Sequence, residues 1–437
     1  MEWYVSAIIL FTIFLVLLFS GMHIGIAFTA AGIIGFLFFE RGLASLPQAV
    51  RIMHDSLFSY GLLAIPLFIL MAELLEAGGA NQRLYTAVQQ WFRWLPGSLP
   101  VTSIITCGIF GAACGSSVAA TASLGKLMLA QMMPRGIHKE LVAGTITAGG
   151  SLSLLIPPSL ALILFGALTQ ASVGKLFIGA IIPGVIQVIL FSIYIIIRVV
   201  RRPELAPAGV ERLPWGKLVR SSWGAMAVLV VIAGVMGSIY SGVCTPNEAG
   251  AIGASLAIII GVLLTRELTW SGIVKSLFNT LSSTGLCIFL LIGAQVFTRL
   301  MALQGIGHSM STAVVGSGLS PYLIISLITV MYIVMGMLMD GISITLLTVP
   351  ILTPILVQLG WDVIWIGVYV TMLINIGLLT PPVGINAYIV GGIGAPYGIK
   401  LSEVFRGSMP FVYIMALTVL LVILFPSLIV WLPATMR

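Results

Sequence analysis

The sequence predicts an all-α, polytopic membrane protein built from two repeats of inverted topology. Each repeat is expected to hold a re-entrant helical hairpin and a broken helix. Three observations predict this fold class. Charged residues are rare, apolar runs of membrane-spanning length follow one another along the chain, and the same glycine and proline motifs occur in the same order in both halves.

Composition alone excludes an ordinary soluble domain. Charged residues make up 8% of the 437-residue chain, whereas a soluble domain carries about a quarter. Because this small number of charges cannot cover a protein surface in water, a lipid bilayer must surround the fold. The net charge of +7 does not indicate nucleic-acid binding, because the basic residues lie in short loops between apolar runs, where they orient membrane proteins.

A spanning helix needs about 20 mostly apolar residues. The first apolar run lacks the basic segment of a signal peptide, so we expect it to be retained as a span. The expected single spans are 4–20, 22–39, 57–77, 174–198, 222–241, 246–265, 276–300 and 407–433.

Two longer stretches, 98–134 and 319–359, have polar or glycine-rich centres and are predicted to be helix–turn–helix hairpins. At the centre of the first, Gly115 permits a sharp turn, and Ser116 or Ser117 can cap the returning helix. At the centre of the second, Asp340 precedes a glycine, which is a turn signal with a capping side chain.

Two further stretches, 139–171 and 362–393, are predicted to be helices broken by the pairs Pro157-Pro158 and Pro381-Pro382. Each pair removes two backbone donors and frees carbonyls one turn earlier. Such carbonyls persist at membrane depth only when they are buried in protein or line a cavity. Carbonyl and hydroxyl oxygens suit a dehydrated alkali cation, and helix N-termini suit an anion. We therefore expect one cation site per half, with an anion between the hairpin tips.

The two halves match through short motifs at nearly constant offsets. Leu155 to Pro158 corresponds to Leu379 to Pro382 at an offset of 224, and Gly97 to Pro100 corresponds to Gly318 to Pro321 at 221. These matches predict a first repeat over 1–210 and a second over 218–437. Each repeat has an odd number of crossings, so the second must be inverted, as in many secondary transporters.

The basic connection 198–220 is the only long hydrophilic segment. The positive-inside rule places it in the cytoplasm, and both termini then fall on the opposite side of the membrane. Thr245, Pro246 and Glu248 have the pattern of N-cap, N1 and N3 of a helix. The sequence contains no paired carboxylates, metal-ligand cluster, nucleophile elbow or phosphate loop, so we expect no enzyme activity.

Four motifs together resemble the large membrane subunit of tripartite ATP-independent periplasmic (TRAP) transporters, of the sialic acid or C4-dicarboxylate type. The resemblance covers essentially the whole chain. The motifs are Cys114-Gly115-Ser116-Ser117-Val118-Ala119-Ala120-Thr121, Ile156-Pro157-Pro158-Ser159, Thr245-Pro246-Asn247-Glu248-Ala249-Gly250-Ala251 and Gly377-Leu378-Leu379-Thr380-Pro381-Pro382-Val383-Gly384.

The resemblance implies a sodium-coupled secondary active importer of an organic anion in the bacterial inner membrane, with both termini periplasmic. It implies two partners, a small four-helix membrane subunit and a periplasmic substrate-binding protein. It also implies an elevator mechanism, in which a transport domain moves against a scaffold. The implied scaffold helices comprise 1–97, 173–200 and 218–318, the implied hairpin and transport helices comprise 98–172 and 319–394, and a final helix covers 402–434.

The resemblance also implies the site residues. The first sodium site would use Cys114, Ser116, Ser153, Ile156 and Pro158, mainly through backbone oxygens. The second would use Gly336, Gly377, Thr380 and Val383. The candidates for substrate binding are Ser116, Ser117, Asp340 and Thr345. The chain departs from the family pattern at Cys114, where serine is usual, and at Ser153, where glycine is usual.

Some alternatives stay open at this stage. Asp340 is either a helix cap or a functional acid. Arg299 ends a span near the outer face, where anchoring is favoured over attraction of an anion or of the binding protein. A stand-alone sodium/dicarboxylate or citrate carrier is the alternative function. The sequence does not specify which organic anion is carried.

Overall fold

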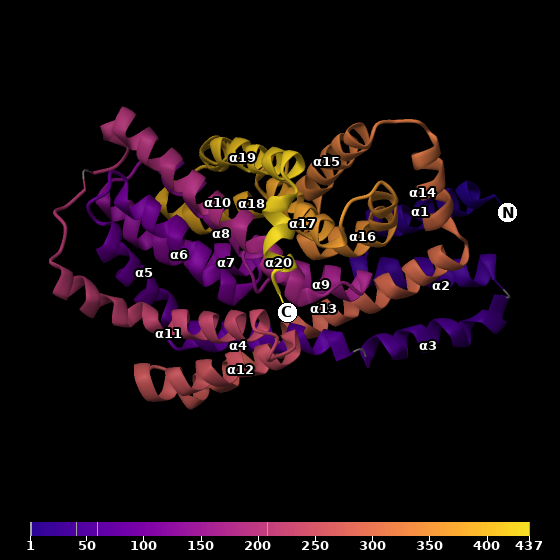
Figure 1. The fold of residues 1–437 in the computed structure, drawn as a ribbon, viewed down its shortest axis with the longest axis horizontal. Coiled ribbons are helices and arrows are strands. Elements are labelled where there is room, and N and C mark those ends of the chain that lie inside the picture. Colours follow the sequence, from indigo (N-terminus) through magenta and orange to yellow (C-terminus); the bar gives the residue numbers. More distant parts are fainter. Residues whose placement is uncertain (1, 41, 59, 208, 437) are drawn as a thin grey trace.

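The computed structural model describes residues 2–40, 42–58, 60–207 and 209–436, and within these ranges it is helical and contains no strand. Figure 1 shows most of the long helices lying roughly along the long axis of the molecule. Seven of the described helices are long and apolar enough to cross a membrane, or up to nine if each of two bent helix pairs is one span. The all-α, polytopic fold class is therefore confirmed.

The helices of the first half end at the basic connection. They are α1 (Trp3–Phe19), α2 (Ile24–Phe39), α3 (Leu46–Leu57), α4 (Ala64–Ala77), α5 (Ala80–Phe92), α6 (Ser98–Cys114), α7 (Ser117–Met132), α8 (Lys139–Leu155), α9 (Leu160–Thr169) and α10 (Val173–Arg201).

The helices of the second half follow the basic connection. They are α11 (Trp215–Tyr240), α12 (Pro246–Ile259), α13 (Trp270–Leu303), α14 (Ile306–Gly316), α15 (Pro321–Leu338), α16 (Gly341–Gln358), α17 (Val363–Leu379), α18 (Ile385–Gly394), α19 (Leu401–Leu424) and α20 (Ser427–Ala434).

Both predicted hairpins are confirmed. In the first, α6 and α7 meet at Gly115, whose φ of +63° is in the left-handed region that favours glycine. Ser116 is the N-cap of α7, as one of the two predicted alternatives had it. In the second, α15 and α16 meet at Met339 and Asp340. The capping box of Thr245 and Glu248 at the start of α12 is also confirmed.

Both predicted broken helices are confirmed as well. The first break separates α8 from α9 at Ile156 to Ser159, and the second separates α17 from α18 at Thr380 to Gly384. The bonds Pro157–Pro158 and Pro381–Pro382 are cis. The two breaks differ in exposure, because Pro157 and Pro158 are buried whereas Pro381 and Pro382 are exposed.

The prediction of a single final span over 407–433, and of a final helix over 402–434, is wrong. Helix α19 ends at Leu424, and a separate short helix, α20, begins at Ser427. Pro426 is the physical reason. It has no amide hydrogen, and it disfavours the helical conformation in the preceding residue. Phe425 accordingly has φ −127° and ψ 74°.

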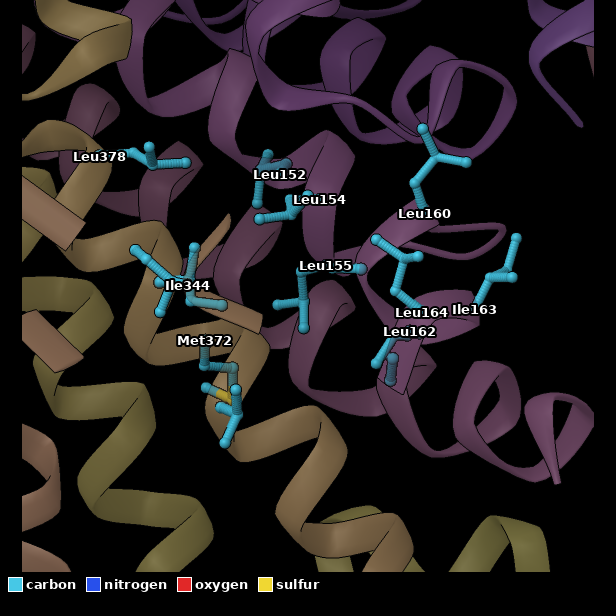
Figure 2. Packing of buried hydrophobic residues seen from close by; sticks show 14 of the residues in the cluster. Leu152, Leu154, Leu155, Leu160, Leu162, Ile163, Leu164, Ile344, Met372 and Leu378 are labelled. Carbon is cyan, nitrogen blue, oxygen red and sulfur yellow. The ribbon is translucent and has the colours of Figure 1, made fainter. Parts of the chain in front are cut away.

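Apolar side chains around the first break join the two halves of the chain. Figure 2 shows Leu155 of α8 lying between Leu162 of α9 on one side and Ile344 of α16 with Met372 of α17 on the other. All four side chains are buried. The first broken helix is thus packed against the hairpin and the broken helix of the second half.

Candidate ion and substrate site

The first hairpin touches the first broken helix at Gly111 and Ser153. A Cβ atom built on Gly111 of α6 would lie 2.8 Å from Cα of Ser153 in α8, and 2.7 Å from its Oγ. Real Cβ atoms do not approach backbone atoms so closely, so only glycine fits here. At the turn of the hairpin, the Leu160 amide donates a hydrogen bond to the Gly115 carbonyl at 3.2 Å. We call this pair of contacts the first junction.

The chemistry of the first junction comes from oxygen atoms freed by the proline pair. Pro157 cannot donate to the Ser153 carbonyl, and Pro158 cannot donate to the Leu154 carbonyl. The hydroxyl of Ser159 donates to the Leu154 carbonyl instead. The hydroxyl of Ser153 is fully buried and has no hydrogen-bond partner among the described residues. Ser153 therefore offers oxygen atoms that a cation can use.

The other residues expected at the first sodium site lie around the same turn. Ser116 accepts a hydrogen bond from the Ala119 amide at 3.4 Å, and the Cys114 thiol contacts the Ser116 carbonyl at 3.7 Å. The Pro158 carbonyl faces Gly115, because a Cβ built there would lie 3.1 Å from it. The Ile156 side chain points away from the turn and packs against glycines of α6 and α10, which leaves its backbone for the site.

The second hairpin touches the second broken helix at a pair of glycines. A Cβ built on Gly336 of α15 would lie 2.8 Å from Cα of Gly377 in α17, and one built on Gly377 would clash with Cα of Gly336. The Gly384 amide donates to the Met337 carbonyl at 3.2 Å. We call these contacts the second junction. It repeats the first, with Gly377 at the position of Ser153.

Thr380 and Val383 lie in the second break. The Thr380 hydroxyl donates to the Ile376 carbonyl at 2.6 Å, and its amide donates to the Gly377 carbonyl at 3.0 Å. Its oxygen lone pairs remain available after donation. Val383 is half-buried and precedes Gly384, whose φ is +56°. Each break therefore carries a hydroxyl that donates to a carbonyl of the preceding helix, Ser159 in the first and Thr380 in the second. Only the first junction adds an unpaired hydroxyl, that of Ser153.

Asp340 caps α16, as one of its two interpretations expected. Its carboxylate accepts hydrogen bonds from the Ile342 amide at 3.0 Å, the Ser343 amide at 3.2 Å and the Ser343 hydroxyl at 2.5 Å. Thr345 is buried one turn later, and its hydroxyl donates to the Gly341 carbonyl at 2.7 Å. Both candidate substrate residues of the second hairpin thus already have partners within their own helix.

The two halves meet through a hydrogen bond that sequence reasoning missed. Nδ2 of Asn386, in α18, donates to Oγ of Ser117, in α7, at 2.5 Å, and both residues are buried. Oδ1 of Asn386 has no partner among the described residues. The available signal was an amide side chain in the first turn of an otherwise apolar helix, directly after the second break.

The two junctions offer uncharged oxygen atoms as ligands. Among the described residues, no three His, Cys, Asp or Glu side chains come together as a metal site. Asn375 in α17 is fully buried, and neither atom of its amide has a partner among the described residues. Neutral carbonyl, hydroxyl and amide oxygens suit a weakly held alkali cation rather than a transition metal.

Residues 11–428 match the family described as the tripartite ATP-independent periplasmic transporter, DctM component. The C4-dicarboxylate TRAP transporter large permease protein DctM of Pseudomonas aeruginosa is 30% identical over 394 residues, which cover 89% of this chain and 90% of that protein. The sialic acid TRAP transporter permease protein SiaT of Haemophilus influenzae is 27% identical over 429 residues, which cover 98% of this chain and 68% of SiaT.

A solved structure, that of the YdaH transporter of Alcanivorax borkumensis, superposes with a TM-score of 0.63 at 14% sequence identity. The match covers 89% of each chain. At this identity the likeness concerns the fold alone.

Proposed function

Because the chain belongs to the family of DctM components of tripartite ATP-independent periplasmic transporters, we propose that it is the large membrane subunit of a sodium-coupled importer of an organic anion. The family consists of transporter permeases and not of enzymes. The observation that supports the ion coupling best is the repeated junction. In both halves a hairpin tip is packed, backbone against backbone, on a helix broken by two prolines.

We assign one sodium ion to each junction. The first would be bound by oxygens of Cys114, Ser116, Ser153, Ile156 and Pro158, and the second by oxygens of Gly336, Gly377, Thr380 and Val383. The buried, unpaired hydroxyl of Ser153 supports the first assignment. Each ion would bridge a hairpin tip and a broken helix, so binding would fix the distance between these two elements.

The organic anion would bind between the hairpin tips, once the ions have ordered them. The N-termini of α7 and α16 carry partial positive charge that favours an anion. At α16 the capping carboxylate of Asp340 opposes this field, whereas α7 is capped by the neutral Ser116. The anion should therefore bind closer to Ser116 and Ser117 than to Asp340 and Thr345.

The remaining features of the proposal concern the whole assembly. The transport helices 98–172 and 319–394 would move as an elevator against the scaffold formed by the other helices. A small four-helix membrane subunit would complete the scaffold, and a periplasmic binding protein would deliver the substrate. The chain would lie in a bacterial inner membrane with both termini periplasmic. Relatives named for C4-dicarboxylate and for sialic acid support an organic anion as the substrate class.

The test is uptake into proteoliposomes that contain this chain and the small subunit. We expect uptake only with an inward sodium gradient and with the binding protein outside. Uptake by this chain alone would favour the stand-alone sodium/dicarboxylate or citrate carrier, and uptake without a sodium gradient would contradict the sodium coupling in either form.

A further inference from the structure

A polar cavity of about 760 Å³ lies between α3, α9 and α13, away from both junctions. We call it the outer cavity. Its volume is in the range of small-molecule sites, about 300–1,000 Å³. Its polar lining consists of two arginines, one aspartate, one serine and three glutamines, which are Arg51, Arg299, Asp55, Ser56, Gln48, Gln170 and Gln295.

The lining follows helical periodicity on both walls. Leu291, Gln295 and Arg299 are spaced four residues apart on α13, so they form one stripe that faces the cavity. On α3, the facing stripe consists of Gln48, Arg51 and Asp55, which are three and four residues apart. Gln295 and Arg299 thus lie on one face of a membrane-spanning helix, and polar residues within such helices usually serve a function.

The cavity has a positive excess that is available to a ligand. Arg299 is exposed and makes no hydrogen bond or ion pair with any residue in the described ranges. Arg51 contacts Asp55 only at 3.8 Å, between Nε and the carboxylate, and both side chains are more than half exposed. Pairs of this kind are weak. Two guanidinium groups against one carboxylate leave a net positive charge.

Helix α9 connects the cavity with the first junction. It begins at Leu160, whose amide binds the first hairpin, and Ala167 and Gln170 at its other end line the cavity. Ten helical residues span about 15 Å. Gln170 also lies three residues before the start of α10, which runs 29 residues from Val173 to Arg201 at the basic connection. Figure 1 shows α10 leading to the connection between α10 and α11. The cavity is therefore on the membrane side opposite that connection.

We propose that the outer cavity is a reception site in which Arg299 and Arg51 hold the carboxylate of the arriving organic anion before it reaches the hairpin tips. This inference rests on the proposed function. Guanidinium groups bind carboxylates through paired, charge-assisted hydrogen bonds. The amides of Gln48, Gln170 and Gln295 provide further donors for the polar remainder of the anion.

The test is uptake by proteoliposomes with the small subunit and the binding protein, using succinate, N-acetylneuraminate and 2-oxoglutarate as probes. The probe that the wild type imports is then used for the variants. Import of none of these, or of any without sodium, would count against the proposed function itself. For R299Q we expect the uptake rate at subsaturating loaded binding protein to fall about tenfold, because one charge-assisted hydrogen-bonding group is lost.

Three further variants test whether the positive charge at position 299 is what matters. R299K should stay within about threefold of the wild type, because it keeps the charge. The exposed residue Lys175, on α10 and outside the cavity, provides the control K175Q, which should transport normally. In R299C, a trimethylammonium methanethiosulfonate reagent should restore uptake, and the sulfonate reagent should not. The wild type treated with both reagents controls for its own cysteines.

Two results would overturn the proposal. One is an uptake rate equal to that of the wild type, both for R299Q and for R299C treated with either reagent. The other is weaker docking of the substrate-free binding protein to R299Q in nanodiscs, equal to the loss in uptake. That result would assign Arg299 to a protein–protein contact. Unchanged docking with impaired uptake supports the reception site.

Discussion

Alanine at Gly336 is expected to separate α15 from α17 and to weaken sodium binding at the second junction. The added Cβ would lie 2.8 Å from Cα of Gly377, with backbone atoms as its three nearest neighbours. An ordinary carbon–carbon contact needs about 3.4 Å or more, so the helices must move apart by about 0.6 Å. No side-chain rotamer can relieve this contact, and overpacking of this kind costs about 1–3 kcal/mol.

The displacement exceeds the tolerance of an ion site. Ligand distances in metal sites hold to within about 0.2 Å, so we expect sodium affinity at this junction to fall at least tenfold. Tenfold weaker binding removes about 1.4 kcal/mol of sodium-dependent stabilisation at saturating sodium. The assay is thermal unfolding of the purified chain during sodium titration, with choline keeping the ionic strength constant.

Gly285 provides the matched control. It lies in α13, and a Cβ built there would meet no atom within 4 Å. G285A makes the same chemical change without a steric clash, so its sodium-dependent shift in melting temperature should equal that of the wild type. An undiminished shift in G336A, with the same midpoint concentration of sodium, would refute the reasoning from the packed glycine pair.

Three further predictions concern individual side chains. S153A should lower sodium affinity about tenfold or less while leaving the melting temperature without sodium nearly unchanged, because the lost hydroxyl has no protein partner; unchanged sodium titration would exclude this hydroxyl as a ligand. S117A and N386A should destabilise the chain non-additively in thermal unfolding, with a coupling of about 0.5–1.5 kcal/mol; additive effects would mean that their hydrogen bond contributes nothing. Leucine at Thr380 or Ser116 should weaken the sodium dependence of uptake in a chain that still elutes as a folded species, and unchanged sodium activation would contradict those assignments.

The elements that the sequence predicted well are those whose causes are local. A proline pair breaks a helix wherever it occurs. Gly115 permits a reversal in the first hairpin, and Asp340 before a glycine is a turn signal in the second, so both breaks and both hairpins were predictable. Asp340 was ambiguous in sequence, because a carboxylate at a turn suits both a cap and a functional site. Its three hydrogen bonds within α16 show the cap.

The features that were missed depend on amphipathic or tertiary effects. Helices α3, α5 and α14 are short and partly polar, so a search for long apolar runs does not detect them. The break at Phe425 lies in an apolar run, where hydropathy conceals the proline. The bond between Ser117 and Asn386 joins residues 269 positions apart, and the outer cavity needs three helices from both halves. Neither that hydrogen bond nor the outer cavity can be located from one sequence window alone.

The most direct test of the two proposed ion sites is the sodium stoichiometry of the purified chain. Equilibrium binding of radioactive sodium would be measured on the wild type, G336A and G285A under the same conditions. The account predicts two ions per chain for the wild type and for G285A, and one for G336A at sodium concentrations that fill the first junction. Equal stoichiometry and affinity in all three proteins, or no saturable sodium binding in the wild type, would contradict it.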